Sequence, residues 1–166
     1  MKMTSVEDFG LRLEKTTDVA ELNSLEKCNS VAVSRNIKPE DITERLKSVH
    51  SITFAKLQDD EVAWAVAVAE KLLPETHQDR LPAHLRTGKA LNQLILKRWF
   101  LTRSGLEELL NTSDPNIASI FLEVHEHHTI TDEEKSKLCE LAGQKGIELF
   151  WHMPKFHDNR GIKRRQ

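Results

Sequence analysis

The sequence predicts an all-α fold, a compact domain of about seven helices with no significant sheet. Three observations support this prediction. The 166 residues have the length of one domain. Helix-starting patterns recur along the chain, among them Lys38-Pro39-Glu40-Asp41 and Thr131-Asp132-Glu133-Glu134. The chain has only 6 glycines and 5 prolines, and it lacks the Asn-Gly and Asp-Gly dipeptides that are typical of β-hairpins.

The N-terminal part predicts three helices. A short one runs from Ser5 to Glu14, and a second begins at the N-cap pair Thr17-Asp18. The segment 31–33 either extends the second helix or forms a short extended link. The third helix opens at Pro39 and runs to about Leu57. Apolar side chains recur at helical spacing in the second and third helices: Val19, Leu22, Leu25 and Cys28, then Ile42, Leu46 and Val49.

The run from Val62 to Ala69 fits two structures. It alternates with period two, as a strand does, but it also fits helical spacing. We interpret it as a buried helix, because the alternating residue is alanine and because acidic residues precede it. This is the longest apolar run, and a transmembrane helix needs about 20 such residues. The sequence therefore predicts no membrane span.

The C-terminal half predicts four more helices. Residues 74–87 contain two prolines and predict a hinge between two helical halves. The expected helices begin near Thr87, at Ser104, at Pro115 (ending near His128) and at the Thr131 capping box. A last apolar patch covers 147–151. The predicted domain thus spans residues 1–151, followed by a basic tail over 152–166.

Composition and missing motifs guide the functional hypothesis. The net charge of −2 argues against a globally basic nucleic-acid protein, and two cysteines are too few for a disulfide scaffold. The chain has no Gly-x-Ser-x-Gly elbow, phosphate-binding loop or dinucleotide fingerprint. We therefore expect a cytoplasmic, non-enzymatic protein-interaction module that acts without a cofactor. Its self-association is left open.

The end of the chain is the predicted partner-binding segment. Aromatic residues and methionine are grouped there, ahead of a basic tail, and this composition is typical of an interface anchor. The predicted contact residues are Phe150, Trp151, Met153, Phe156, Arg160, Lys163, Arg164 and Arg165.

A first alternative is a nucleic-acid-binding regulator. Residues 104–123 have the spacing of a helix-turn-helix, with Asn111 at the turn. Ser113, Asn116, Ser119 and Arg103 would then contact nucleic acid together with the basic tail. The second helix of this pair would carry no lysine or arginine, so an ordinary packed helix pair is the favoured interpretation.

A second alternative is a metal-dependent enzyme. His125 and His128 lie three residues apart, so on a helix both could reach one metal ion. The competing interpretation makes His128 a helix-end residue that interacts with the last carbonyl groups. The spacing does not match His-Glu-x-x-His, since residue 129 is threonine.

Overall fold

The computed structural model describes residues 5–6, 10–24, 30–47, 49–75, 92–113, 116–125 and 128–152. It shows an α/β fold built on one seven-stranded sheet. Six strands run parallel, and the first pairs antiparallel with the second. The predicted all-α domain of about seven helices is therefore wrong, and four α-helices lie in the described part of the chain.

The strands follow one another in space in the same order as in the sequence. They are β1 (Ser5–Val6), β2 (Gly10–Leu13), β3 (Val31–Val33), β4 (Ser51–Ala55), β5 (Asn92–Lys97), β6 (Ile117–Glu123) and β7 (Glu148–His152). The helices are α1 (Asp18–Asn23), α2 (Val62–Leu72), α3 (Arg103–Thr112) and α4 (Asp132–Gln144), with 3₁₀ turns η1 (Pro39–Asp41) and η2 (Asp59–Glu61).

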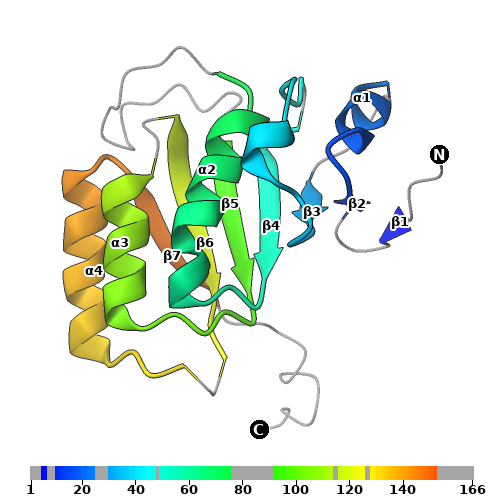
Figure 1. Ribbon diagram of the computed structural model, residues 1–166. Helices are drawn as coiled ribbons and strands as arrows, with labels where there is room; N and C mark the ends of the chain where they lie inside the picture. Colours follow the sequence, from blue (N-terminus) through cyan, green and yellow to red (C-terminus); the bar gives the residue numbers. More distant parts are fainter. Residues whose placement is uncertain are drawn as a thin grey trace, which may run out of the picture.

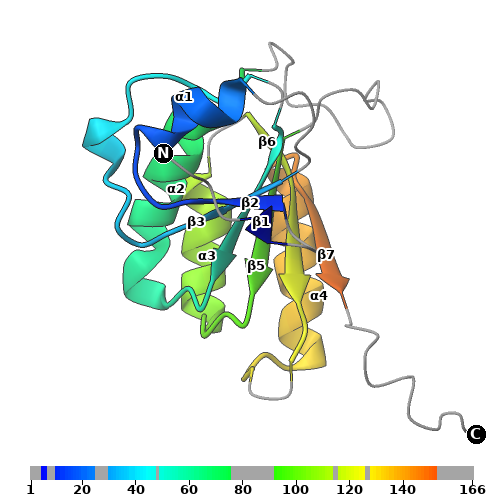
Figure 2. The ribbon, with the colours of Figure 1, turned by 90° about the vertical axis from the view of Figure 1, so that its right-hand side faces the viewer.

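This strand order places the main helices on one face of the sheet. Crossovers between parallel strands are right-handed, so a chain that always steps to the next strand in the same direction keeps its helices on one side. Helices α2, α3 and α4 lie side by side in front of the sheet (Figure 1). Figure 2 shows β5, β6 and β7 with α2 and α3 to their left. No described helix packs on the opposite face.

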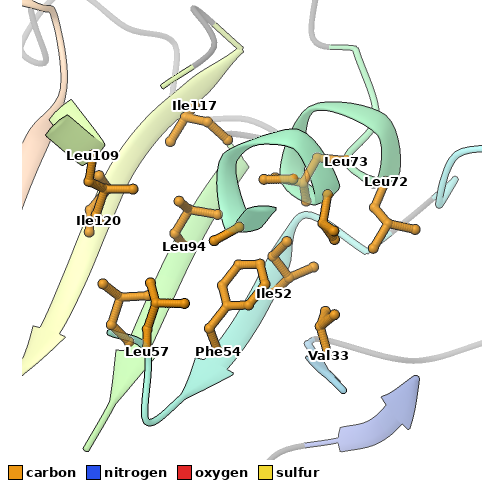
Figure 3. Packing of buried hydrophobic residues seen from close by; sticks show 14 of the residues in the cluster. Val33, Ile52, Phe54, Leu57, Leu72, Leu73, Leu94, Leu109, Ile117 and Ile120 are labelled. Carbon is orange, nitrogen blue, oxygen red and sulfur yellow. The ribbon is translucent and has the colours of Figure 1, made fainter. Parts of the chain in front are cut away.

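The hydrophobic core lies between these helices and the sheet. In β5 the side chains are alternately buried and half-buried, as expected for a strand with one covered face. Figure 3 shows Ile52, Phe54 and Leu94 from β4 and β5 packed together with Leu72 and Leu73 from the end of α2. Burial of these side chains supplies the main force that holds the helices on the sheet.

Four of the predicted helices are wrong. The segment from Ser5 to Glu14 contains β1 and β2, and the segment from Pro39 to Leu57 contains η1 and β4. The helix expected from Thr87 is replaced by β5, and the one from Pro115 to His128 by β6. Short apolar runs fit either helix or strand, and here pairing with neighbouring strands decides the outcome.

Several local predictions are confirmed. The alanine-rich run forms α2, and residues 31–33 take the extended alternative as β3. In the capping box at the start of α4, the Thr131 hydroxyl accepts a hydrogen bond from the Glu134 N–H, and the Glu134 carboxylate accepts one from the Thr131 N–H.

No described helix is long and apolar enough to cross a membrane. The predicted hinge lies mostly outside the described residues, as do tail residues 153–166.

Candidate functional site

The candidate site is the face of the sheet that the described helices leave uncovered. Gln93, Ile95 and Lys97 of β5 point to this face, because Leu94 and Leu96 between them are buried against the helices. The side chains of the neighbouring strands point alternately in the same way, although Thr53 and Ser119 on this face are themselves buried. We call this surface the open face.

The strand register aligns the side chains of the open face into three rows across the sheet. The first row contains Ser51, Gln93, Ser119 and Glu148, and the central row contains Thr53, Ile95, Phe121 and Phe150. The third row contains Ala55, Lys97, Glu123 and His152. Lys97 and Glu123 directly follow the paired residues Leu96 and Leu122, so they occupy the same row.

An aromatic pair forms the end of the central row. The ring centroids of Phe121 and Phe150 are 4.6 Å apart across β6 and β7. The Phe150 side chain is 37% exposed, and Ile95 and Phe121 are half-buried. Among the described residues, Phe100 is the other large hydrophobic side chain that is exposed, at 52%. The open face thus holds an apolar centre that stays in contact with water.

Polar groups flank this centre on both sides. In the first row the Gln93 side-chain amide donates a hydrogen bond of 3.1 Å to the Ser119 hydroxyl. In the third row Glu123 and His152 lie opposite each other on β6 and β7. The open face therefore combines an apolar strip with charged and hydrogen-bonding borders.

The residues predicted to bind a partner do not share one surface. Phe150 lies on the open face, whereas Trp151 points to the helix side. The Trp151 ring centroid lies 6.3 Å from that of Trp99, and the Lys135 Nζ is 5.3 Å from the Trp151 centroid. The Nε1 atom of Trp151 is buried and has no hydrogen-bond partner among the residues that the structure describes. The remaining six predicted residues, from Met153 onward, lie outside the described part.

The two histidines predicted to bind metal lie against Trp99, which is fully buried. The His125 Nε2 donates to the Trp99 carbonyl oxygen at 2.6 Å, because a carbonyl oxygen can only accept. The His128 Nδ1 accepts a hydrogen bond from the Ile130 N–H at 3.1 Å. Burial, followed by the positive charge of Lys135, lowers the pKa of His128. Both rings therefore have structural contacts within this loop.

A metal site is not apparent from these contacts. The His125 and His128 ring centroids are 6.0 Å apart, with the planes nearly perpendicular. No group of three or more potential metal ligands is found within the described ranges. Metal binding by this pair stays a prediction.

The helix pair expected for residues 104–123, and with it the alternative of a helix-turn-helix, is wrong. The first helix exists as α3, but the second is replaced by β6. The proposed contact residues are spread over different elements. Ser113 donates to the Leu109 carbonyl, Asn116 donates to the Pro74 carbonyl, Ser119 accepts from Gln93, and Arg103 forms ion pairs with Glu107 and Glu134. Nucleic-acid binding by these residues stays a prediction without that motif.

Sequence reasoning missed most of the open face. The signal in the sequence was the short apolar run of Leu94, Ile95 and Leu96, which fits a strand as well as a helix. The rows themselves depend on strand register, which a single strand does not reveal. No protein-family model matches the sequence, and no curated protein matches it.

Proposed function

We propose that the protein is a non-enzymatic interaction module that binds a protein partner on the open face of its sheet. The observation that carries this proposal is the aromatic pair of exposed Phe150 and half-buried Phe121 at the β7 end of the central row. The module presents a strand surface and not the helical surface that the sequence suggested.

The layout of the open face supports protein binding. Protein interfaces typically have an apolar, aromatic centre inside a polar rim, and a few central aromatic residues supply most of the binding energy. The central row supplies the centre, and the first and third rows supply the rim. Because the aromatic side chains stand on paired strands, little conformational freedom is lost when a partner binds.

The charges of the open face favour a protein over a nucleic acid. The carboxylates of Glu123 and Glu148 border the aromatic pair, and carboxylates repel phosphate groups. Lys97 lies on the same face, so both signs of charge are present. A protein surface with its own mixed charges is the partner that this pattern suits.

We place this activity in the cytoplasm. Cys139 is an exposed, free thiol on α4. Exposed thiols persist in reducing compartments, and oxidising compartments favour disulfides.

The proposal is tested by affinity capture from the lysate of the native host. The bait is the full chain, compared with Ile95→Glu, which places a charge in the central row. Phe100→Glu is the matched control, because Phe100 is an exposed aromatic residue on the loop after β5 and not on the open face. Far-UV circular dichroism checks that both variants are folded.

We expect a protein that is retained by the wild type and by Phe100→Glu and is lost with Ile95→Glu. Nuclease treatment should leave this partner in place. Capture that disappears with nuclease, or that survives Ile95→Glu unchanged, would overturn the proposal.

A further inference from the structure

At the carboxyl edge of the sheet, the neighbouring strands β4 and β5 end side by side (Figure 1). Lys56 directly follows β4 and Arg98 directly follows β5, and both residues are exposed. The residues before them are paired in register, so the two cations leave the sheet one strand spacing, about 4.8 Å, apart. We propose that Lys56 and Arg98, together with Phe100, bind an acidic segment of a partner protein. We call these three residues the edge patch.

The charges of Lys56 and Arg98 are available to a partner. Neither side chain forms an ion pair with another residue in the described ranges. Arg35, at the matching position after β3, shows the contrast. Its guanidinium donates to the Glu61 carboxylate at 3.0 Å and also to the Lys56 carbonyl. The charge of Arg35 is therefore used within the molecule, where it supports the turn that carries Lys56.

The backbone at both cations is of a kind that glycine adopts more easily. Lys56 and Arg98 have φ angles of 60° and 53°, in the left-handed region where a Cβ atom crowds a neighbouring carbonyl oxygen. They are the two non-glycine residues with positive φ in the part of the chain that the structure describes. Strained residues of this kind cluster at ligand-binding sites. The strain therefore supports a binding role for the two side chains, because glycine would remove it.

Phe100 adds an apolar surface beside the two cations. It lies two residues beyond Arg98 and is 52% exposed. Its N–H donates a hydrogen bond of 2.8 Å to the Leu57 carbonyl, and its ring centroid lies 6.1 Å from that of His125. Because the backbone of Phe100 is fixed to the preceding unit and its ring contacts His125, little conformational freedom is lost when a ligand covers the ring.

The composition of the edge patch favours an acidic protein segment as its ligand. The two cations attract carboxylates, and the exposed ring accepts an apolar side chain. A segment that has an apolar residue among glutamates or aspartates offers both groups. A nucleic acid fits less well, because the exposed carboxylate of Asp60 follows Lys56 closely and repels phosphate groups.

Fluorescence anisotropy of a labelled peptide tests the proposal with the full chain. The probe has pairs of glutamates on both sides of a leucine, and the reference peptide has glutamine in place of every glutamate. We expect the wild type to bind the glutamate peptide about tenfold more tightly than the glutamine peptide at low salt, because contacts to charged groups are the stronger ones. This difference should shrink as salt is added, since salt screens exposed charges.

Glycine variants separate binding from folding. Lys56→Gly and Arg98→Gly each remove one cation, and each should raise the dissociation constant of the glutamate peptide about tenfold. Because glycine adopts a positive φ without strain, the urea midpoint of neither variant should fall below that of the wild type. Affinity would then be lost from a protein that is folded as well as before.

Three further variants locate the contact. Lys47→Gln removes an exposed positive charge ahead of β4, at the opposite end of that strand, and should leave the dissociation constant unchanged. Phe100→Glu places a carboxylate in the edge patch and should abolish binding of the glutamate peptide. Ile95→Glu changes the open face and should still bind this peptide, so the two proposals fail separately.

Three results would refute the proposal. The first is equal binding of the glutamate and glutamine peptides by the wild type. The second is a loss of affinity with Lys47→Gln as large as that with Lys56→Gly. The third is a single-stranded oligonucleotide that binds the wild type more tightly than the glutamate peptide and is lost with Arg98→Gly, because the edge patch would then serve nucleic acid.

Discussion

At the scale of single residues, two helical glycines occupy opposite surroundings. A Cβ atom at position 105 would lie 1.9 Å from the Asp59 Oδ1, whereas one at position 143 would meet nothing within 4 Å. The Asp59 carboxylate accepts hydrogen bonds from the Thr102 N–H at 3.0 Å and from its hydroxyl at 2.6 Å. Gly105 therefore lets Asp59 of η2 hold the N-terminus of α3.

These surroundings predict opposite effects of alanine. Gly105→Ala should lower the free energy of unfolding by about 1–2 kcal/mol, because the new methyl group displaces a hydrogen-bonded carboxylate. Gly143→Ala should raise it by about 0.5 kcal/mol, because alanine is the better helix former. Urea unfolding of both variants and of the wild type measures these changes in the free energy of unfolding. Stabilisation by Gly105→Ala would show that Asp59 moves aside freely.

Neighbouring residues can also have very different exposure. Trp99 is fully buried and donates its indole N–H to the Glu123 carbonyl at 2.8 Å, whereas Phe100 beside it is 52% exposed. Both lie in the segment where a helix was expected to begin near Thr87. Both residues follow the end of β5 and the turn at Arg98, whose φ angle is 53°, so neither lies on a helix.

At the scale of elements, the loop after β3 is tied to the start of α2 by an ion pair. The Arg35 Nε lies 2.5 Å from the Glu61 Oε2, and the Arg35 guanidinium also donates to the Lys56 carbonyl. Glu61 in turn accepts a hydrogen bond of 2.9 Å from the Gln58 N–H. The hydrogen bond from Arg35 is the main reason that the pKa of Glu61 lies below its ordinary value.

This ion pair predicts a pH-dependent contribution to stability. Glu61→Gln should lower the free energy of unfolding by about 1 kcal/mol at pH 7, as expected for a partly exposed pair. The pKa of Glu61 is lower in the folded state than its ordinary 4.5. The contribution is therefore complete above about pH 4.5 and is lost as the pH falls through the lower folded value.

Urea unfolding of wild type and variant at several pH values measures this difference. Glu140→Gln, which changes an exposed carboxylate on α4, is the control. Its free energy of unfolding should stay close to that of the wild type at every pH. The difference in free energy of unfolding between wild type and Glu61→Gln should shrink on acidification. A difference that grows instead would contradict the predicted role of the Arg35 pair.

Successive strand-helix units repeat one turn. Lys56 follows β4 and Arg98 follows β5, and both have positive φ angles, 60° and 53°. The residues before them, Ala55 and Lys97, are paired in register. Just beyond, Gln58 and Phe100 form an isolated parallel bridge. The units thus match in backbone conformation although their side chains differ.

At the scale of the whole molecule, one hydrophobic core runs under the sheet from β2 to the start of β7. Its members extend from Leu13 to Ile147. The strands on either side of residues 76–91, β4 and β5, are neighbours over five residue pairs. We therefore expect the described part of the chain to unfold as one cooperative unit.

Ile120→Ala tests this expectation. Ile120 is fully buried on β6, and its truncation should lower the free energy of unfolding by about 2–5 kcal/mol. Tryptophan fluorescence and far-UV circular dichroism should shift together in urea. Two separate transitions, with only one shifted, would instead indicate halves joined by the hinge predicted at residues 74–87.

The sequence by itself determined the elements whose stability is local. The capping box at Thr131 specifies the start of α4, and the alanines between Val62 and Ala69 favour a helix over a strand. These signals act between residues three or four positions apart, so they can be recognised without knowing the fold. Phe150 was named as a partner-binding residue from the composition of its segment, and that role stays a prediction.

Only the tertiary structure decided the sheet and everything built on it. The strand β4 exists because Ile52 pairs with Leu94, 42 positions further along the chain. Such a short apolar run fits a helix equally well until a neighbouring strand satisfies its backbone hydrogen bonds. The same pairing brings Phe121 beside Phe150 and points Trp151 to the other side of the sheet. The open face is therefore a product of register, which is set between strands and not within one.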